Sequence, residues 1–154
     1  MRQAVVQTVW HFLSFDDLSK LQLYQLLLLR SEVFVVEQAC VYLDIDGADM
    51  AAMHLLGTID GQLLAYARCL PPGSKFNEPS IGRVITHRNL RGQGAGHRLV
   101  QESVQRLTQH WGAQAIRIDA QAHLEAFYRQ HGFLPVSAQY IEDGIPHIEM
   151  LRPA

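Results

Sequence analysis

Cysteine is scarce in this chain of 154 residues, which contains only Cys40 and Cys69. The two cysteines have no CxxC spacing and no paired histidine motif, so the pattern that marks a structural zinc site is absent. We therefore expect no metal. A disulfide between the two stays open, but two free, buried thiols are the expectation for a reducing compartment.

Long apolar runs and an excess of one charge are also lacking. Runs such as residues 26–29 are far too short to cross a membrane. The N-terminus does not show a basic stretch followed by an apolar one, as a signal peptide would. We expect a soluble, cytoplasmic protein with no membrane partner. The formal net charge of −2 provides no basic field for nucleic acid, so an anionic ligand would need a local binding feature.

The length and the apolar pattern predict one folded domain over residues 1–154. Helical periodicity is expected over residues 18–30, 96–111 and 122–131. Strands are expected over residues 54–59, 62–70, 81–86, 115–120, 134–140 and 145–151. Residues 40–53 are expected to form a loop or a short helix. This order predicts an α/β (α+β) fold, in which helices cover the faces of a mixed β-sheet.

Local turn and cap signals support these elements. Asp60-Gly61 and Asp143-Gly144 each lie between two predicted strands, and Asp-Gly pairs tolerate the positive φ angles of a type I′ hairpin turn. Asp16 and Asp17 precede the first helix as candidate N-caps. Two β-hairpins are therefore expected, one before and one after the central helices.

The most informative segment is a glycine-rich turn, Arg91-Gly92-Gln93-Gly94-Ala95-Gly96, between a predicted strand and a predicted helix. The first N–H groups of a helix have no intrahelical acceptor, and glycines let a phosphate approach the backbone. The P-loop pattern fails because His97 and Arg98 follow the last glycine. The dinucleotide pattern GxGxxG also fails, because His97 stands where its third glycine belongs.

The turn does match the pattern Arg-x-x-Gly-x-Gly, and here it resembles the acetyl-CoA pyrophosphate loop of the GNAT acetyltransferase superfamily. A second match lies downstream, where residues 127–133 read Phe-Tyr-Arg-Gln-His-Gly-Phe. Longer strings at residues 30–38, 44–46, 120–123 and 142–147 resemble the bacterial ElaA-like branch of that superfamily. The resemblance implies the fold and an enzyme that moves an acetyl group from acetyl-CoA to a primary amine of a small molecule or peptide, by direct attack in a ternary complex.

The resemblance also implies roles for individual residues. Tyr128 would protonate the departing thiolate, because a phenol is neutral at pH 7 and carries its proton. Gln121 stands where the family usually has a CoA-contacting asparagine. The remaining donor contacts would come from Val84, Ile85 and Thr86 along the pantetheine and from Arg91, Gly92, Gln93, Gly94, Ala95 and Gly96 around the pyrophosphate.

The acceptor side is less defined by the sequence. Glu37, His123 and His147 are polar residues at element ends or on the last hairpin, and we expect them to border the acceptor pocket. The general base stays open among these residues, Glu149 and an ordered water. Arg68 and Arg83 lie in strand-like runs and require acidic partners, for which Glu37, Asp44 and Asp46 are the candidates.

Two other functions share this fold. One is a non-catalytic acyl-CoA-binding sensor, which the presence of Tyr128 disfavours. The other is an acyl-homoserine-lactone synthase, which the Arg-x-x-Val-Phe run at residues 30–34 weakly suggests and the clear glycine-rich turn disfavours. Whether the chain forms a homodimer stays open.

Overall fold

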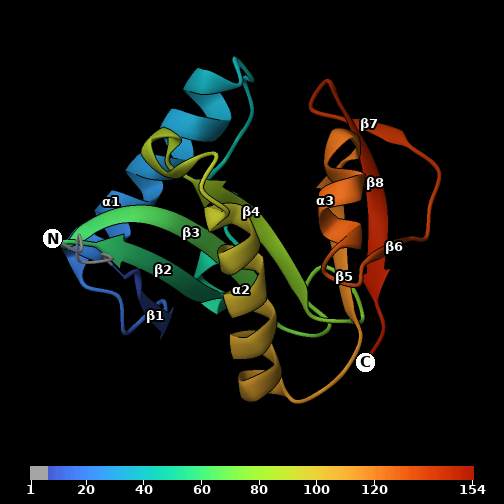
Figure 1. The fold of residues 1–154 in the computed structure, drawn as a ribbon, viewed down its shortest axis with the longest axis horizontal. Helices are drawn as coiled ribbons and strands as arrows, with labels where there is room; N and C mark the ends of the chain where they lie inside the picture. Colours follow the sequence, from blue (N-terminus) through green and yellow to red (C-terminus); the bar gives the residue numbers. More distant parts are fainter. Residues whose placement is uncertain (1–6) are drawn as a thin grey trace, which may run out of the picture.

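The structure is a computed structural model that describes residues 7–154. Its strands form two antiparallel sheets, drawn in Figure 1. The first sheet has the order β1 (Val9–Ser14), β2 (Met53–Ile59), β3 (Gln62–Leu70) and β4 (Ser80–Thr86). The second has the order β5 (Ile116–Gln121), β8 (Ile145–Arg152) and β6 (Leu134–Pro135), with β7 (Tyr140–Glu142) also paired to β8. The expected mixed α/β architecture is confirmed.

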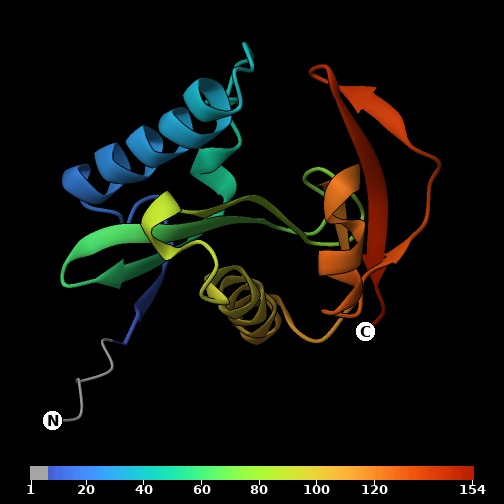
Figure 2. The same ribbon diagram turned by 45° about the horizontal axis from the view of Figure 1, so that its top comes forward.

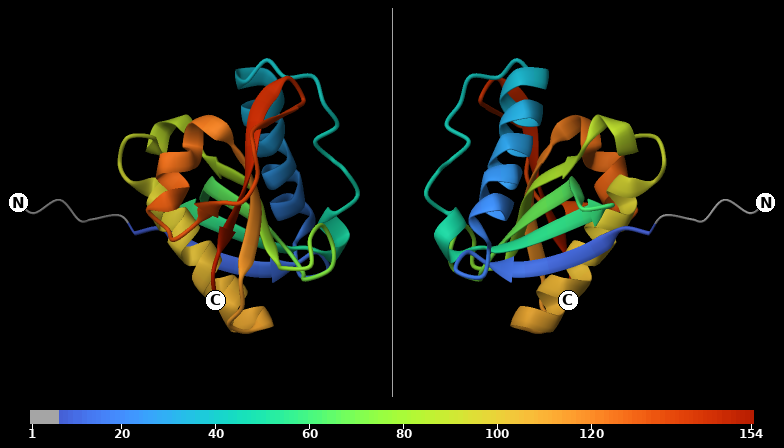
Figure 3. Two further views of the ribbon diagram at one scale, coloured as in Figure 1. Left: turned by 90° about the vertical axis from the view of Figure 1, so that its right-hand side faces the viewer. Right: turned by 90° about the vertical axis from the view of Figure 1, so that its left-hand side faces the viewer.

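Helices lie on both faces of the first sheet. Figure 3 shows α1 and α2 on opposite sides of the green strands. The longer helices are α1 (Lys20–Arg30), the π-helix η1 (Ser31–Glu37) that continues it, α2 (Ala95–Trp111) and α3 (Glu125–Arg129). Single turns of 3₁₀ helix form η2 (Asp49–Ala51), η3 (Arg88–Leu90) and η4 (Ala122–Leu124).

The core consists of one apolar layer on each side of the first sheet. Leu55 packs in the layer beneath α2, whereas its neighbour Leu56 packs beneath α1, because successive strand residues point to opposite faces. The α2 layer continues into the second sheet through Ile118 and Met150. Strands β2 and β3 are therefore buried on both faces, which explains their nearly continuous apolar sequence.

Several predicted boundaries need correction. The N-cap of α1 is Ser19, whose hydroxyl accepts from the Gln22 N–H in a capping box, and not Asp16 or Asp17. The strand predicted over residues 134–140 is instead two short strands, β6 and β7. The helix predicted over residues 122–131 is a 3₁₀ turn followed by α3, and it ends before Gly132.

Strand β1 was not expected from the sequence. Its place at the edge of the sheet depends on Gly57 of β2, because a Cβ there would lie 2.6 Å from Cζ3 of Trp10. The bare glycine lets the indole ring lie flat against the neighbouring strand. A contact of this kind depends on the pairing of two distant segments, so the local pattern of residues 9–14 could not reveal it.

Both predicted hairpins are confirmed. Asp60 and Gly61 have φ angles of 51° and 75°, and Asp143 and Gly144 have φ angles of 49° and 76°. In each case the flanking residues pair directly, leaving a two-residue loop. Positive φ at both central positions is the signature of a type I′ turn.

A buried ion network holds the segment between η1 and β2 against the first sheet. Arg30 is fully buried, and its guanidinium donates to Asp44 at 3.0 Å and to Asp49 at 2.6 Å. Arg68 donates to Asp46 at 2.8 Å and also to Asp49 at 3.1 Å. The hydrogen bond from Arg68 holds the pKa of the Asp46 carboxyl well below its usual range, although partial burial opposes this.

The network makes Arg30 a stability determinant. We expect Arg30→Leu to lower the free energy of unfolding by about 3–5 kcal/mol, because Asp44 and Asp49 lose a buried counterion. Urea unfolding measures this loss. The control is Arg106→Leu, which breaks a partly exposed i,i+4 pair with Glu102 and should cost only about 0.3–0.5 kcal/mol. Equal losses in the two variants would contradict the prediction.

The network also predicts the direction of the pH dependence. A carboxyl whose folded-state pKa is depressed stabilises the fold above its unfolded pKa, about 3.9, and loses this contribution as the pH falls further. We expect Asp46→Asn to be less stable than wild type at pH 7 and to approach it in acid. Thermal unfolding of both proteins from pH 7 to pH 3 checks this. A stability difference that grows toward acid pH would contradict it.

Candidate functional site

The two sheets separate to form a cleft. Strands β4 and β5 begin side by side, where the N–H of Arg117 donates to the carbonyl of Pro79 at 3.1 Å. Beyond that point they diverge, and Figure 2 shows the opening between the green and the orange-red strands. A cleft of about 600 Å³ lies there, with one wall from β4 and the segment after η1 and the other from β5, α3 and the β7–β8 hairpin.

A β-bulge in β4 accompanies this divergence. Tyr66 of β3 pairs with Ile85 of β4, and Arg68 pairs with Gly82, so β4 has one more residue than β3 between these two pairs. Arg83, which lies in this stretch, has a φ of 48°. As a result, Ile81 packs in the α2 layer and Ile85 in the α1 layer, although residues four apart share a face in a regular strand. The Arg83 guanidinium donates to Asp44 at 2.8 Å and so links the bulge to the ion network.

The partners predicted for Arg68 and Arg83 are confirmed for Asp44 and Asp46 and wrong for Glu37. Val84 lines the cleft, whereas Ile85 is buried beneath α1 and Thr86 lies past the lining. Within residues 7–154, the edge of β4 that faces the cleft has no strand partner, because β4 ends its sheet. Backbone groups along such an edge can bind an extended ligand.

The glycine-rich turn has the geometry expected of an anion site. Gly92 and Gly94 have φ angles of 80° and 73°, and a Cβ on either would meet no atom within 4 Å. Gly94 is the N-cap of α2, which begins at Ala95, one residue before the predicted start. The space beside Gly92 and Gly94 is therefore open, next to the first N–H groups of α2, which have no intrahelical acceptor.

Arg91 stands at the head of this turn. Its Nε donates to the carbonyl of Thr86 at 3.2 Å, and its guanidinium pairs with the Glu37 carboxylate at 2.9 Å. The hydrogen bond from Arg91 lowers the pKa of Glu37. The end of η1 is thereby tied to the turn. Glu37 does not line the cleft, so the structure places it beside the predicted donor site rather than beside the predicted acceptor residues.

Tyr128 of α3 lies at the inner side of the cleft. The residue is 8% exposed, packs against Phe127 and Phe133, and lines the cleft. Burial raises the pKa of Tyr128 to about 12, so its hydroxyl keeps its proton throughout the physiological range. Within residues 7–154 no side chain or backbone group forms a hydrogen bond with this hydroxyl, which leaves it available to a ligand.

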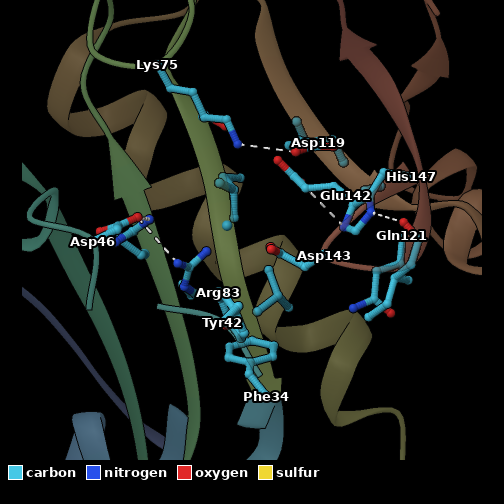
Figure 4. Close-up of a pocket in the computed structure, with 18 of the residues that line it drawn as sticks. Phe34, Tyr42, Asp46, Lys75, Arg83, Asp119, Gln121, Glu142, Asp143 and His147 are labelled. Carbon is cyan, nitrogen blue, oxygen red and sulfur yellow. Dashed lines mark hydrogen bonds and ion pairs between the residues drawn. The ribbon is translucent and has the colours of Figure 1, made fainter. Parts of the chain in front are cut away.

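A polar wall faces the cleft from the second sheet, as Figure 4 shows. The side chains of Asp119, Glu142 and His147 bring their polar atoms within 4.8 Å of one another. Lys75 binds Asp119 at 3.4 Å, and the Tyr140 hydroxyl donates to the same carboxylate. Contact with Asp119, together with partial burial, raises the pKa of Glu142, while the pKa of Asp119 is lowered.

The structure brings part of the predicted site together in the cleft, while the turn at residues 91–96 and Glu37 lie outside its lining. His123, His147, Gln121 and Tyr128 all line the cleft. The Gln121 amide donates weakly to the Gln38 side chain at 3.5 Å, across the cleft. The sequence reasoning missed Asp119, although the alternation of apolar and polar residues over residues 116–121 was a usable signal.

Glu142 was also missed, although it belongs to the string at residues 142–147 that resembles the ElaA-like branch. Neither cysteine belongs to a disulfide. Cys69 is buried in the core, where burial raises the pKa of its thiol to about 12. Cys40 is half-buried and contacts the carbonyl of Asp143 at 3.4 Å.

Over the part of the chain that the structure describes, no helix combines the length and the apolar character needed to cross a membrane.

The family follows from these features and from comparison with known proteins. Residues 20–152 match the acetyltransferase (GNAT) domain family, which covers the diverging strands, the turn and the Tyr128 helix. The chain belongs to this family of acyl-CoA-dependent transferases.

Within the family, the chain is similar to proteins of the ElaA branch. Protein ElaA of Escherichia coli K12 is 46% identical over 145 residues, 93% of this chain and 95% of that protein. The crystal structure of E. coli ElaA matches with a TM-score of 0.89, covering 95% of this chain and 99% of the other. An acyl-CoA N-acyltransferase from Pseudomonas aeruginosa matches at 44% identity with a TM-score of 0.91 over the same shares.

A more distant match concerns the fold alone. The acyl-homoserine-lactone synthase LasI is 13% identical and matches with a TM-score of 0.78, covering 96% of this chain and 90% of that chain. The likeness to acyl-homoserine-lactone synthases that the Arg-x-x-Val-Phe run suggested is therefore a likeness of fold.

The turn geometry predicts the effect of a substitution at Gly94. Gly94→Val should weaken CoA binding at least about tenfold, because the branched side chain would fill the open space in front of the α2 N–H groups. Calorimetric titration with CoA measures the affinity. Gly112→Val is the matched control, since Gly112 has a φ of 91° at the other end of the same helix. Equal CoA affinity in the Gly94 variant and wild type would contradict the assignment.

Proposed function

We propose that this chain transfers an acetyl group from acetyl-CoA to a primary amine, by direct attack in a ternary complex. One observation carries the proposal. The Tyr128 hydroxyl, nine-tenths buried and without a protein partner in the described chain, lines a cleft between two strands that diverge. A neutral phenol at this position supports the departure of a thiolate, the leaving group of a thioester.

The donor side follows from the backbone of β4 and the turn. The unpaired edge of β4 at residues 84–86 offers N–H and carbonyl groups to the pantetheine arm, as an added strand would. The strand leads directly through η3 into the turn at residues 91–96, where the α2 N–H groups suit a pyrophosphate. Gln121, in the cleft at the end of β5, is placed for an amide contact with the same molecule.

Arg91 and Glu37 complete this side. The Arg91 guanidinium offers positive charge at the head of the turn, and Glu37 fixes its orientation through the pair at 2.9 Å. We therefore propose a positioning role for Glu37 in place of acceptor contact. The acceptor side then consists of the cleft residues His123 and His147 with the polar wall around them.

The acceptor must lose its charge before it reacts, because an ammonium has no lone pair. The nitrogen then attacks the thioester carbon, the carbonyl oxygen gains negative charge, and the carbon–sulfur bond breaks. A backbone N–H on the free edge of β4 suits the oxygen, and Tyr128 suits the sulfur. A thiol-release assay with acetyl-CoA and a panel of amines tests the proposal, and the absence of turnover with every amine would refute it.

Tyr128→Phe tests the role of the hydroxyl while keeping the ring. Turnover should fall about 10²–10⁴-fold, because the thiolate loses its proton donor. CoA affinity should hold, since the turn is untouched. The deficit should shrink as the pH rises past about 8.5, where a thiolate leaves without help. Rates, CoA affinity and melting temperature measured on one preparation give the answer.

A buried tyrosine outside the cleft provides the control. The Tyr66 hydroxyl bonds Nδ1 of His54 at 2.6 Å, so Tyr66→Phe should lower the melting temperature and leave turnover per folded molecule unchanged. If folded Tyr128→Phe protein keeps full activity at pH 7, Tyr128 has no catalytic role.

A further inference from the structure

The cations that line the cleft already have partners. Arg68 is bound by Asp46 and Asp49, Arg83 is bound by Asp44 and Asp46, and Lys75 is bound by Asp119. The ion pairs of Arg68 and Arg83 belong to the ion network, so each of these two guanidinium groups has a carboxylate counterion. Within residues 7–154, every lysine and arginine of the lining therefore has a carboxylate partner, and the weakest of these pairs is the long, half-exposed one of Lys75 with Asp119.

In the described chain, two carboxylates of the opposite wall lack a lysine or arginine partner. Glu142 and Asp143 line the cleft, and neither has a lysine or arginine partner among the described residues. The nearest basic group to Glu142 is the His147 imidazole, at 3.7 Å. The Nδ1 of that ring faces the carbonyl of Ile145 at 2.7 Å, which makes Nδ1 the donor and leaves Nε2 toward Glu142. Glu142 and Asp143 therefore give this wall negative charge that no lysine or arginine of residues 7–154 pairs with.

Two further features of the same cleft indicate what would enter it. The Tyr128 hydroxyl lies nine-tenths buried in the lining without a protein partner, so the reacting end of a ligand has a polar group to meet. Apolar side chains also line the space, among them Phe34, Leu43, Leu70 and Ile145. A ligand that fits both features carries a cation on an alkyl chain.

We propose that the Asp119–Glu142 pair, with His147, binds the acceptor as an ammonium, and that the acceptor class is alkyl primary amines without a neighbouring carboxylate. The inference rests on the proposed acetyl transfer and adds the substrate class to it. A carboxylate beside the amine would meet Glu142 and Asp143, which have no lysine or arginine partner within residues 7–154, and like charges in an interface are strongly unfavourable.

The pair also takes a proton. The bound ammonium gives one proton to the Asp119–Glu142 pair, which later releases it to solvent. The neutral nitrogen attacks the thioester carbonyl carbon, so that a carbon–nitrogen bond forms and the carbon–sulfur bond breaks. Tyr128 gives its proton to the sulfur and regains one, through solvent, from the acylated nitrogen. One ammonium and one acetyl thioester thus yield one amide, one thiol and one proton.

Glu142→Gln is the decisive variant, because it keeps the shape of the side chain and removes its charge. We expect kcat/KM for 1,4-diaminobutane to fall at least about tenfold, with KM for acetyl-CoA unchanged. Calorimetric binding of 1,4-diaminobutane should weaken by a similar factor, which gives a readout independent of turnover. Asp119→Asn should act in the same direction, and Glu102→Gln, on the far part of α2, should change neither quantity.

A matched pair of acceptors tests the predicted class. Wild type should prefer alaninamide to alanine at least about tenfold in kcat/KM, and Glu142→Gln should narrow this ratio while Glu102→Gln does not. Unchanged diamine binding and turnover in folded Glu142→Gln protein would overturn the inference, as would a wild-type preference for alanine. If wild type turns over amines and the Glu142→Gln protein binds and acetylates the diamine equally well, only this inference is refuted. The absence of turnover with every amine refutes the proposed function and the inference with it.

Discussion

The pairing of the Arg83 bulge with Asp44 is the constraint on which the cleft depends. An arginine with a φ of 48° is strained, and the bulge reverses the faces of the strand on either side. The Arg83–Asp44 ion pair at 2.8 Å holds it in place. Asp44 in turn is held by Arg30, which is fully buried at the end of α1. The wall of the cleft is therefore fixed by the core of the first sheet and not by loop contacts alone.

The parts of the fold that the sequence could predict are those that a few adjacent residues determine. Asp60-Gly61 forms its turn because both residues accept positive φ, and Gly94 caps α2 for the same reason. Strand β1 could not be predicted, because its packing depends on the fit of Trp10 against Gly57 across a strand pair. The start of the helix after β5 was predicted too early, because residues 122–124 form a 3₁₀ turn before α3 begins.

The site residues also fall into those that a local motif identifies and those that only the fold brings together. Tyr128 and the turn belong to continuous motifs, so the family resemblance was enough to single them out. The Asp119–Glu142 contact joins β5 to β7 through the intervening β8, and only the folded sheet brings the two carboxyl groups together. Glu37 lies elsewhere than the sequence led us to expect. Its charge after an apolar run suggested a substrate contact, whereas its partner is Arg91, which is distant in sequence.

The Glu37–Arg91 pair has a consequence for ion selectivity. A guanidinium already matched to a carboxylate produces little field at long range, so the turn does not attract small anions indiscriminately. An anion that binds there must either share Arg91 with Glu37 or displace it, and a single weak charge gains little from that exchange. A diphosphate bound as we propose would also contact several α2 N–H groups and would gain more from the exchange. In the proposed donor site, the Glu37 carboxylate would thus compete with weakly bound monoanions such as chloride for Arg91.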